Sequence, residues 1–528
     1  MARFEAYSSF DINHVYFWLL NPGEDPISWG TGTTEFAGVT YRAAVGYYYY
    51  AFDNPEATLL GGADLGLGSA ANLTGTTIQL IQGFTGDFSS GTPIYSLVAN
   101  VPVSLFNDAV YSRVESTSVF SEALKGDDVI ELSSENDVMS GYAGADRING
   151  YAGNDSLYGG DGNDRIWGGA GYDFISGDAG NDIISGGVGI DTASYASAGA
   201  AVAVNLGISV AQDTLGGGID RLTSIENLVG SGFADQLTGN KGANGITGGG
   251  GDDTLIGLEG SDVLAGGDGN DLLDGGVGAD TASYSDSSAR VVVKLGIVGA
   301  QKTGGGGTDT LVSIENAFGS DYDDKIVGSD GANIIWGGAG ADSIAGGDGN
   351  DKLYGSYGPG FFADGRNVLN GGAGNDLLVG AFNPDTLVGG TGNDTLVGQE
   401  DSDSLTGGTG ADRFVLAYDL YSGTDLIVDF SAKQHDKIAL SLAKNTDDAF
   451  AFEAGAGGKL TADEFYSAAG ATNAQDASDR IIYDSTTGAL YYDPDGNLAG
   501  GIDAFQIAQL GSGTTHPALT LADFVIVA

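Results

Sequence analysis

Residues 159–187 read GGDGNDRIWGGAGYDFISGDAGNDIISGG. The stretch repeats a nine-residue unit three times, and in each unit an aspartate follows a glycine-rich turn and stands two residues before an apolar side chain. Glycine permits the sharp turn, and the x-apolar-x triplet is a minimal strand with its central side chain facing inward. We therefore expect two units to close one flattened coil, and successive coils to stack in parallel at the strand spacing of about 4.8 Å.

The nine-residue period extends over residues 123–418 in three runs. The positions of the first run are Asp128, Asp137, Asp146, Asp155, Asp164, Asp173, Asp182 and Asp191. The second run consists of Asp235, Asn244, Asp253, Asp262, Asp271 and Asp280. The third run consists of Asp324, Asn333, Asp342, Asp351, Asn367, Asp376, Asp385, Asp394, Asp403 and Asp412, with seven extra residues that we place in a loop at 354–366.

A longer repeat overlies the short one. DTASYASAGAAVAVNLG (191–207) recurs 89 residues later as DTASYSDSSARVVVKLG (280–296), and TSIENLVGS (223–231) recurs at the same distance as VSIENAFGS (312–320). One long segment was therefore duplicated whole. We interpret Tyr195 and Tyr284 as packing residues that close each run, and the pairs Glu226/Asn227 and Glu315/Asn316 as structural hydrogen-bonding residues.

Composition limits the partners. The 528 residues include 71 acidic and 20 basic side chains, with a formal charge of -51, and no cysteine. This charge repels phosphate and anionic lipid, so we predict no nucleic-acid partner, and cations are the natural ligands. Without cysteine there is no disulfide framework. The first 25 residues do not resemble a cleaved signal peptide, and no later segment reaches transmembrane length, so we expect no membrane span.

The regular carboxylates favour a calcium site. Aspartates and turn carbonyls that face their equivalents one coil further on would form an all-oxygen cage, which suits Ca²⁺ better than Mg²⁺. With no cysteine and three histidines, zinc and copper sites are disfavoured. The predicted calcium ligands are Asp128, Asp137, Asp146, Asp155, Asp164, Asp173, Asp182, Asp191, Asp235, Asp253, Asp262, Asp271, Asp280, Asp324, Asp342, Asp351, Asp376, Asp394, Asp403 and Asp412.

The repeats resemble those of RTX (repeats-in-toxin, hemolysin-type calcium-binding) secreted proteins. The segments DTASYS…VVVKLG, GGTGADRFVL (407–416) and IIYDSTTGALYYDPDG (481–496) also resemble the C-terminal region of serralysin-type proteases, and the terminus LTLADFVIVA resembles an uncleaved type I secretion signal. The resemblance implies secretion to the extracellular medium or cell surface. Three asparagines (244, 333, 367) replace the aspartate, and AFNPDTL (381–387) and GQEDSDSL (398–405) lose glycines, so we expect weaker or absent ions there.

The fold class that we predict is all-β, with three parts: a β-rich N-terminal domain at 1–122, a parallel calcium-bound β-roll at 123–418, and a C-terminal cap and secretion-signal region at 419–528. Without calcium the stacked carboxylates repel one another and the glycine-rich chain loses much entropy on ordering, so the repeats should be disordered. Extracellular calcium sites bind at roughly 10⁻⁴–10⁻³ M, so the chain should fold only outside the cell.

Three functions remain open. The first is a structural protein of a bacterial surface layer or extracellular matrix that associates with copies of itself, with residues 1–122 and the loop residues Phe361 and Phe362 as candidate interfaces. The second is an adhesin that binds cell-surface polysaccharide through the tyrosines of RAAVGYYYYAFD (42–53). The third is a secreted hydrolase or lyase with an RTX tail. The chain contains neither HExxH nor GxSxG, so we predict that it is not an enzyme.

Overall fold

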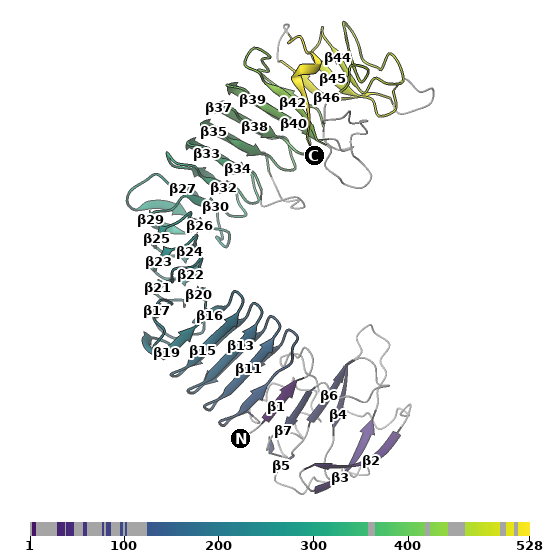
Figure 1. The fold of residues 1–528 in the computed structure, drawn as a ribbon. Helices are drawn as coiled ribbons and strands as arrows, with labels where there is room; N and C mark the ends of the chain where they lie inside the picture. Colours follow the sequence, from purple (N-terminus) through teal and green to yellow (C-terminus); the bar gives the residue numbers. More distant parts are fainter. Residues whose placement is uncertain are drawn as a thin grey trace. The chain divides into compact units, whose positions relative to one another are not determined.

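The computed structural model describes residues 124–356, 365–417, 423–441, 460–496, 503–511 and 516–527, together with the backbone of eight strands before residue 103 (Figure 1). Strands form nearly all of the regular structure in these ranges, and η2 (Leu521–Asp523) is one turn of 3-10 helix. By internal contacts the chain divides into two compact units, Met1–Leu258 and Glu259–Ala528. This division falls within the repeats, and the domain boundaries at 122 and 418 stay predictions.

In the first unit, successive nine-residue units alternate between two parallel sheets (Figure 1). One sheet contains β9 (Val129–Glu131), β11 (Arg147–Ala152), β13 (Arg165–Ala170), β15 (Ile183–Val188) and β19 (Gly218–Thr223). The other contains β10 (Val138–Ser140), β12 (Ser156–Asp161), β14 (Phe174–Ala179), β16 (Thr192–Ser194), β20 (Asn227–Val229) and β22 (Gly245–Gly250). Two nine-residue units therefore close one coil, as predicted.

The register places like residues of neighbouring coils opposite one another. Ile148 lies opposite Ile166, and Ile166 opposite Ile184. On the other sheet Leu157 lies opposite Ile175. All of these side chains are buried between the two sheets. The apolar residue of each unit therefore builds a core that runs the length of the roll, stabilised by about 1.5–3 kcal/mol for each fully buried side chain.

The duplicated segment enlarges the coil in the same way in both copies. In the first copy β18 (Gln212–Leu215) forms an antiparallel hairpin with β19, and a further parallel sheet starts with β17 (Ala203–Asn205), β21 (Gln236–Thr238) and β23 (Thr254–Glu259). In the second copy the corresponding strands are β27 (Val292–Lys294), β28 (Gln301–Gly304), β29 (Gly307–Val312) and β31 (Lys325–Val327). The sheet that contains β15 and β19 therefore ends at β18, and the next sheet begins with β17. In the second copy the sheet ends at β28, and the next begins with β27.

The second unit repeats this architecture and ends in the C-terminal strands. One sheet contains β24 (Val263–Asp268), β26 (Thr281–Ser283), β30 (Asn316–Phe318), β32 (Ile334–Trp336), β34 (Lys352–Tyr354), β36 (Leu377–Val379), β38 (Thr395–Val397), β40 (Arg413–Ala417) and β42 (Lys437–Ser441). Two sheets lie opposite it. The first ends with β25 (Leu272–Val277), β29 and β28. The second begins with β27 and β31 and continues with β33 (Ser343–Asp348), β35 (Val368–Ala373), β37 (Thr386–Thr391), β39 (Ser404–Thr409) and β41 (Asp425–Ile427).

The seven extra residues of the third run fall between Asp342 and Asn367. The backbone N–H of Asp342 donates to Asn367, 25 residues further along, whereas regular neighbours are 18 residues apart. The coil therefore continues across the insertion without losing its register. Phe361 and Phe362 themselves lie outside the described residues.

Strands from outside the repeats pair with the first and last coils. β1 (Arg3–Ala6) pairs in parallel with β9 and continues into antiparallel β7 (Tyr95–Val98), β6 (Ile81–Thr85) and β4 (Glu56–Leu60). At the other end β47 (Phe524–Val527) pairs with β42, and β41 pairs with β46 (Phe505–Leu510), which is followed by β45 (Ala489–Tyr492), β44 (Ile481–Asp484) and β43 (Phe465–Ala468). These strands cover edges that would otherwise present unpaired backbone groups.

The remaining N-terminal strands form two antiparallel pairs. These are β2 (Trp29–Phe36) with β3 (Val39–Gly46), and β5 (Thr77–Ile78) with β8 (Val101–Pro102). They agree with a β-rich N-terminal region, whereas Tyr47–Tyr50 lie outside the described residues.

Candidate calcium sites

The repeated aspartates form hydrogen-bonded ladders along the two edges of the roll. The backbone N–H of Asp146 donates to Oδ1 of Asp164 at 2.8 Å, and that of Asp164 donates to Oδ1 of Asp182 at 2.8 Å. On the other edge the N–H of Asp155 donates to Oδ1 of Asp173 at 2.9 Å. Each of these carboxylates therefore joins two coils through one of its oxygens.

All twenty aspartates predicted as calcium ligands are buried, with at most 3% of any one exposed. In twelve ladder aspartates Oδ2 is buried and has no hydrogen-bond donor: Asp146, Asp155, Asp164, Asp173, Asp182, Asp191, Asp280, Asp351, Asp376, Asp394, Asp403 and Asp412. We call these the open aspartates. A buried carboxylate oxygen without a donor is costly, so each of these atoms requires a positive partner.

Main-chain oxygens gather around the same atoms. A Cβ placed on Gly159 would lie 2.3 Å from Oδ2 of Asp164 and 2.6 Å from the carbonyl oxygen of Gly177. The equivalent glycine in the next unit, Gly168, faces Oδ2 of Asp173 and the carbonyl of Gly186 in the same way. The first glycine of the unit therefore keeps open a space lined by carboxylate and carbonyl oxygens. This donor set fits Ca²⁺.

Side chains alone do not make the site. Among the described residues, no three histidine, cysteine, aspartate or glutamate side chains come together in an arrangement that could hold a metal. A cation here would be held by ladder aspartates together with carbonyls such as that of Gly177. The ion would supply the positive charge that the open carboxylates lack and would join neighbouring coils.

Electrostatics confirm that the cation-free ladder is unfavourable at neutral pH. Burial, with a smaller contribution from neighbouring ladder aspartates, raises the pKa of Asp146 and of Asp155 to about 7. The same causes raise the pKa of Asp182 to about 8. These carboxyls would bind protons near neutrality if no metal were present, because burial disfavours their charged form.

In a second group of ladder aspartates Oδ2 accepts hydrogen bonds from the protein. The N–H and hydroxyl of Ser133 donate to Asp137 at 2.9 and 2.7 Å, and the hydroxyl of Ser231 donates to Asp235 at 2.8 Å. Asp324 accepts from Ser320 in the same way. Asp385, in the segment that loses its glycines, accepts from the N–H of Ala381 at 2.7 Å. We call these, with the two residues described next, the closed aspartates.

Two closed aspartates lie outside the nine-residue series. Oδ1 of Asp220 accepts the N–H of Asp182 at 2.9 Å, while Oδ2 accepts the hydroxyls of Tyr195 at 3.1 Å and Thr214 at 2.7 Å. Asp309 is bonded identically by Tyr284 and Thr303. Sequence reasoning took the tyrosines as packing residues and assigned the aspartates no role. The only available signal was that these residues recur at the 89-residue spacing.

The remaining predictions at the ladder concern glutamate and asparagine. Oε2 of Glu226 accepts the N–H of Asp191 at 3.0 Å. Glu226 therefore makes the structural hydrogen bond that the aspartate of the next coil makes elsewhere in the ladder. Glu315 does the same for Asp280. Asn244 accepts the N–H of Asn240 and donates to the carbonyl of Glu226. The weaker calcium binding expected at the asparagines stays a prediction.

A comparison with known protein families identifies the same repeats. The model of the RTX calcium-binding nonapeptide repeat matches residues 123–157, 158–193, 223–255, 247–282, 318–353, 363–387 and 379–414. The chain therefore carries RTX-type calcium-binding repeats. RTX nonapeptide repeats bind Ca²⁺ at multiple sites and are typical of secreted extracellular proteins. No curated protein matches the chain significantly.

The resemblance to serralysin-type C-terminal regions stays a prediction. Within the described residues, no helix is both long and apolar enough to cross a membrane.

Proposed function

We propose that this RTX protein leaves the cell without calcium through a type I secretion system, folds on extracellular calcium, and serves as a structural component of a surface layer or matrix. The observation that supports it best is the set of twelve open aspartates, whose buried oxygens need a cation in each of the two compact units. At low calcium the repulsion among these groups opposes folding. Outside the cell, the binding energy of the ions becomes folding energy.

Self-association would use the flanks of the roll more than its ends. β1, β46 and β47 already pair with β9, β41 and β42 of the first and last coils and occupy those three edges, while β10 stands at the edge of its sheet. Large apolar side chains are exposed on the turns instead. Val188 and Val277, which are equivalent in the two copies of the duplication, are 76% and 72% exposed. Such side chains at matching turns would favour lateral packing of one roll against another.

Electron microscopy and light scattering of the full chain test the proposal. In millimolar Ca²⁺ we expect ordered sheets or filaments that dissolve in chelator and form again when calcium is restored. Double replacement Val188→Ser and Val277→Ser should weaken assembly and leave calcium-induced folding intact. A compact monomer over a wide range of protein concentration in Ca²⁺ would contradict the structural role, and activity in a screen on polysaccharides, lipids and proteins would favour a hydrolase.

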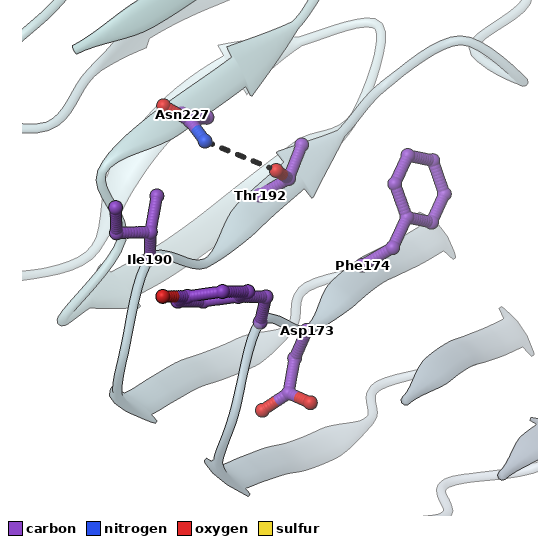
Figure 2. Close-up of a pocket in the computed structure, with 6 residues that line it drawn as sticks. Asp173, Phe174, Ile190, Thr192 and Asn227 are labelled. Atoms are coloured by element: carbon purple, nitrogen blue, oxygen red, sulfur yellow. Dashed lines mark hydrogen bonds between the residues drawn. The ribbon is translucent and has the colours of Figure 1, made fainter. Parts of the chain in front are cut away.

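A pocket on the first unit supports a second candidate, an adhesin that binds polysaccharide. The pocket has a volume of about 290 Å³ and is lined by Tyr172, Asp173, Phe174, Ile190, Thr192 and Asn227. Figure 2 shows Ile190 on the turn beside Thr192 and Asn227, whose side chains are hydrogen-bonded to each other at 3.4 Å. An exposed tyrosine ring next to amide and hydroxyl groups is suited to a sugar ring.

Glycan binding to the calcium-loaded protein distinguishes the two candidates. An adhesin should lose binding when Tyr172→Ala removes the exposed ring, while Tyr322→Ala, which removes an exposed tyrosine outside this pocket, should not affect it. Equal binding by both variants and by the unmodified protein would exclude the pocket as the binding site.

A further inference from the structure

We propose that calcium binds at the open aspartates and not at the closed ones, and that the backbone conformation four residues before each aspartate decides between the two. The inference rests on the calcium binding of RTX repeats. It is independent of whether the protein assembles. It changes the predicted set of calcium ligands, because Asp137, Asp235 and Asp324 become metal-free.

Every open aspartate follows a residue with left-handed backbone at the fourth preceding position. Gly160, before Asp164, has a φ of 101°, and Gly169, before Asp173, has a φ of 115°. At the closed positions the corresponding residues, such as Ser231 before Asp235, have negative φ. At Asp137, Asp235, Asp324 and Asp385 the N–H of that residue points into the carboxylate and occupies the oxygen that would otherwise bind the ion.

Residue type does not explain the difference, since four of the left-handed residues are not glycine. Tyr142, Tyr151, Asp178 and Gln399 precede Asp146, Asp155, Asp182 and Asp403 with φ values of 69°, 72°, 61° and 79°. A left-handed conformation is unfavourable for such residues, because their Cβ crowds the backbone. Strained backbone of this kind persists where a function requires it. Here it keeps an N–H donor away from a carboxylate that receives calcium.

The backbone conformation differs between the two segments that lose glycines, 381–387 and 398–405. Ala381 has negative φ and donates to Asp385, whereas Gln399 is left-handed and Oδ2 of Asp403 has no donor. Loss of the glycine therefore removes the site at Asp385 and leaves it intact at Asp403.

In two clusters, Tyr195–Thr214–Asp220 and Tyr284–Thr303–Asp309, hydroxyl groups and not a backbone N–H satisfy Oδ2 of the aspartate. At Asp220 two hydroxyl donors satisfy Oδ2, and the residue is 1% exposed, so an ion would have to displace hydrogen bonds already made. Asp220 is the last residue of its ladder, and closed Asp235 is the first aspartate of the next. Asp309 and Asp324 repeat the arrangement. Each copy of the duplication therefore interrupts the calcium ladder on one edge with a metal-free stretch.

Counting bound ions in the full chain at saturating Ca²⁺, by native mass spectrometry or equilibrium dialysis, tests the inference. Asp164→Asn should reduce the number of ions by at least one. Asp235→Asn should leave the number unchanged, although it lowers the unfolding midpoint, because the amide nitrogen would face the Ser231 donors. Loss of ions from Asp235→Asn, or no loss from Asp164→Asn, would overturn the inference.

A measurement on the unmodified protein keeps the test independent of folding defects in the variants. An anomalous difference map of calcium-grown crystals should show ions beside Asp164 and Asp173 and none beside Asp220, Asp235 or Asp309. An ion beside any of the last three would refute the proposal. A protein that fails to assemble but shows this pattern of ions would contradict the structural role alone.

Discussion

Each open aspartate uses its two oxygens differently. One oxygen accepts a backbone N–H from the preceding coil, and the other lies buried beside a glycine and a carbonyl without a donor. The nine-residue spacing was sufficient to predict burial, ladder formation and oxygen ligation. It could not separate Asp385 from Asp403, because the residues four positions before them, Ala381 and Gln399, are both non-glycine and only Gln399 is left-handed.

Replacement of the glycine beside the open oxygen should be costly. A Cβ on Gly168 would lie 2.2 Å from Oδ2 of Asp173 and 2.7 Å from the carbonyl of Gly186. Gly168→Ala should therefore destabilise the calcium-loaded protein by about 1–3 kcal/mol, measured by chemical unfolding, and raise the calcium concentration needed for folding. A Cβ on Gly199 meets nothing within 4 Å, so Gly199→Ala is the control. Equal stability of the two variants would show that the space beside Asp173 is not needed.

Proton binding should oppose calcium binding. Burial raises the pKa of Asp164, Asp351 and Asp394 to about 6 and that of Asp155 to about 7. The folded calcium-free state therefore favours the protonated carboxyl, so its stability is greatest below the ordinary pKa of about 4 and is lost as the pH rises through 6 to 8. The calcium concentration at half-folding should increase as the pH is lowered from 8 to 5, measured by circular dichroism. A midpoint independent of pH would argue against buried carboxylates as the ligands.

At the scale of elements, the hairpin formed by β18 and β19 depends on the tyrosine cluster. The sequence predicted the duplication and the coil, but not this cluster, because Tyr195 and Asp220 are 25 residues apart and meet only when β19 pairs with β15. Tyr195→Phe removes one of two hydroxyl donors to a buried carboxylate and should cost about 1–3 kcal/mol. Tyr284→Phe should have the same effect, and Tyr172→Phe, in an exposed tyrosine, should have none. Unfolding of the calcium-loaded variants measures all three.

The C-terminal strands belong to both the fold and the proposed export. Deleting residues 470–528 should retain the protein in the cell, whereas deleting residues 1–122 should not, as measured by the fraction recovered in the medium. The deletion also removes β44, β45, β46 and β47 from the end of the roll, so it could block export by disturbing the fold. The control is therefore an unrelated passenger protein fused to residues 419–528, which should be exported. A passenger that stays inside the cell would contradict a C-terminal export signal.

At the scale of the whole molecule, calcium is the component that the chain lacks. Seventy-one acidic residues against twenty basic ones leave a net charge of -51, so most of the negative charge has no basic side chain to balance it. The most direct test is circular dichroism of the full chain at pH 8 in excess chelator, followed by titration with Ca²⁺ and, separately, Mg²⁺. The account predicts a disordered spectrum in chelator that becomes β-rich cooperatively with Ca²⁺ and not with equal Mg²⁺. A β-rich, fully folded repeat region in excess chelator would contradict it.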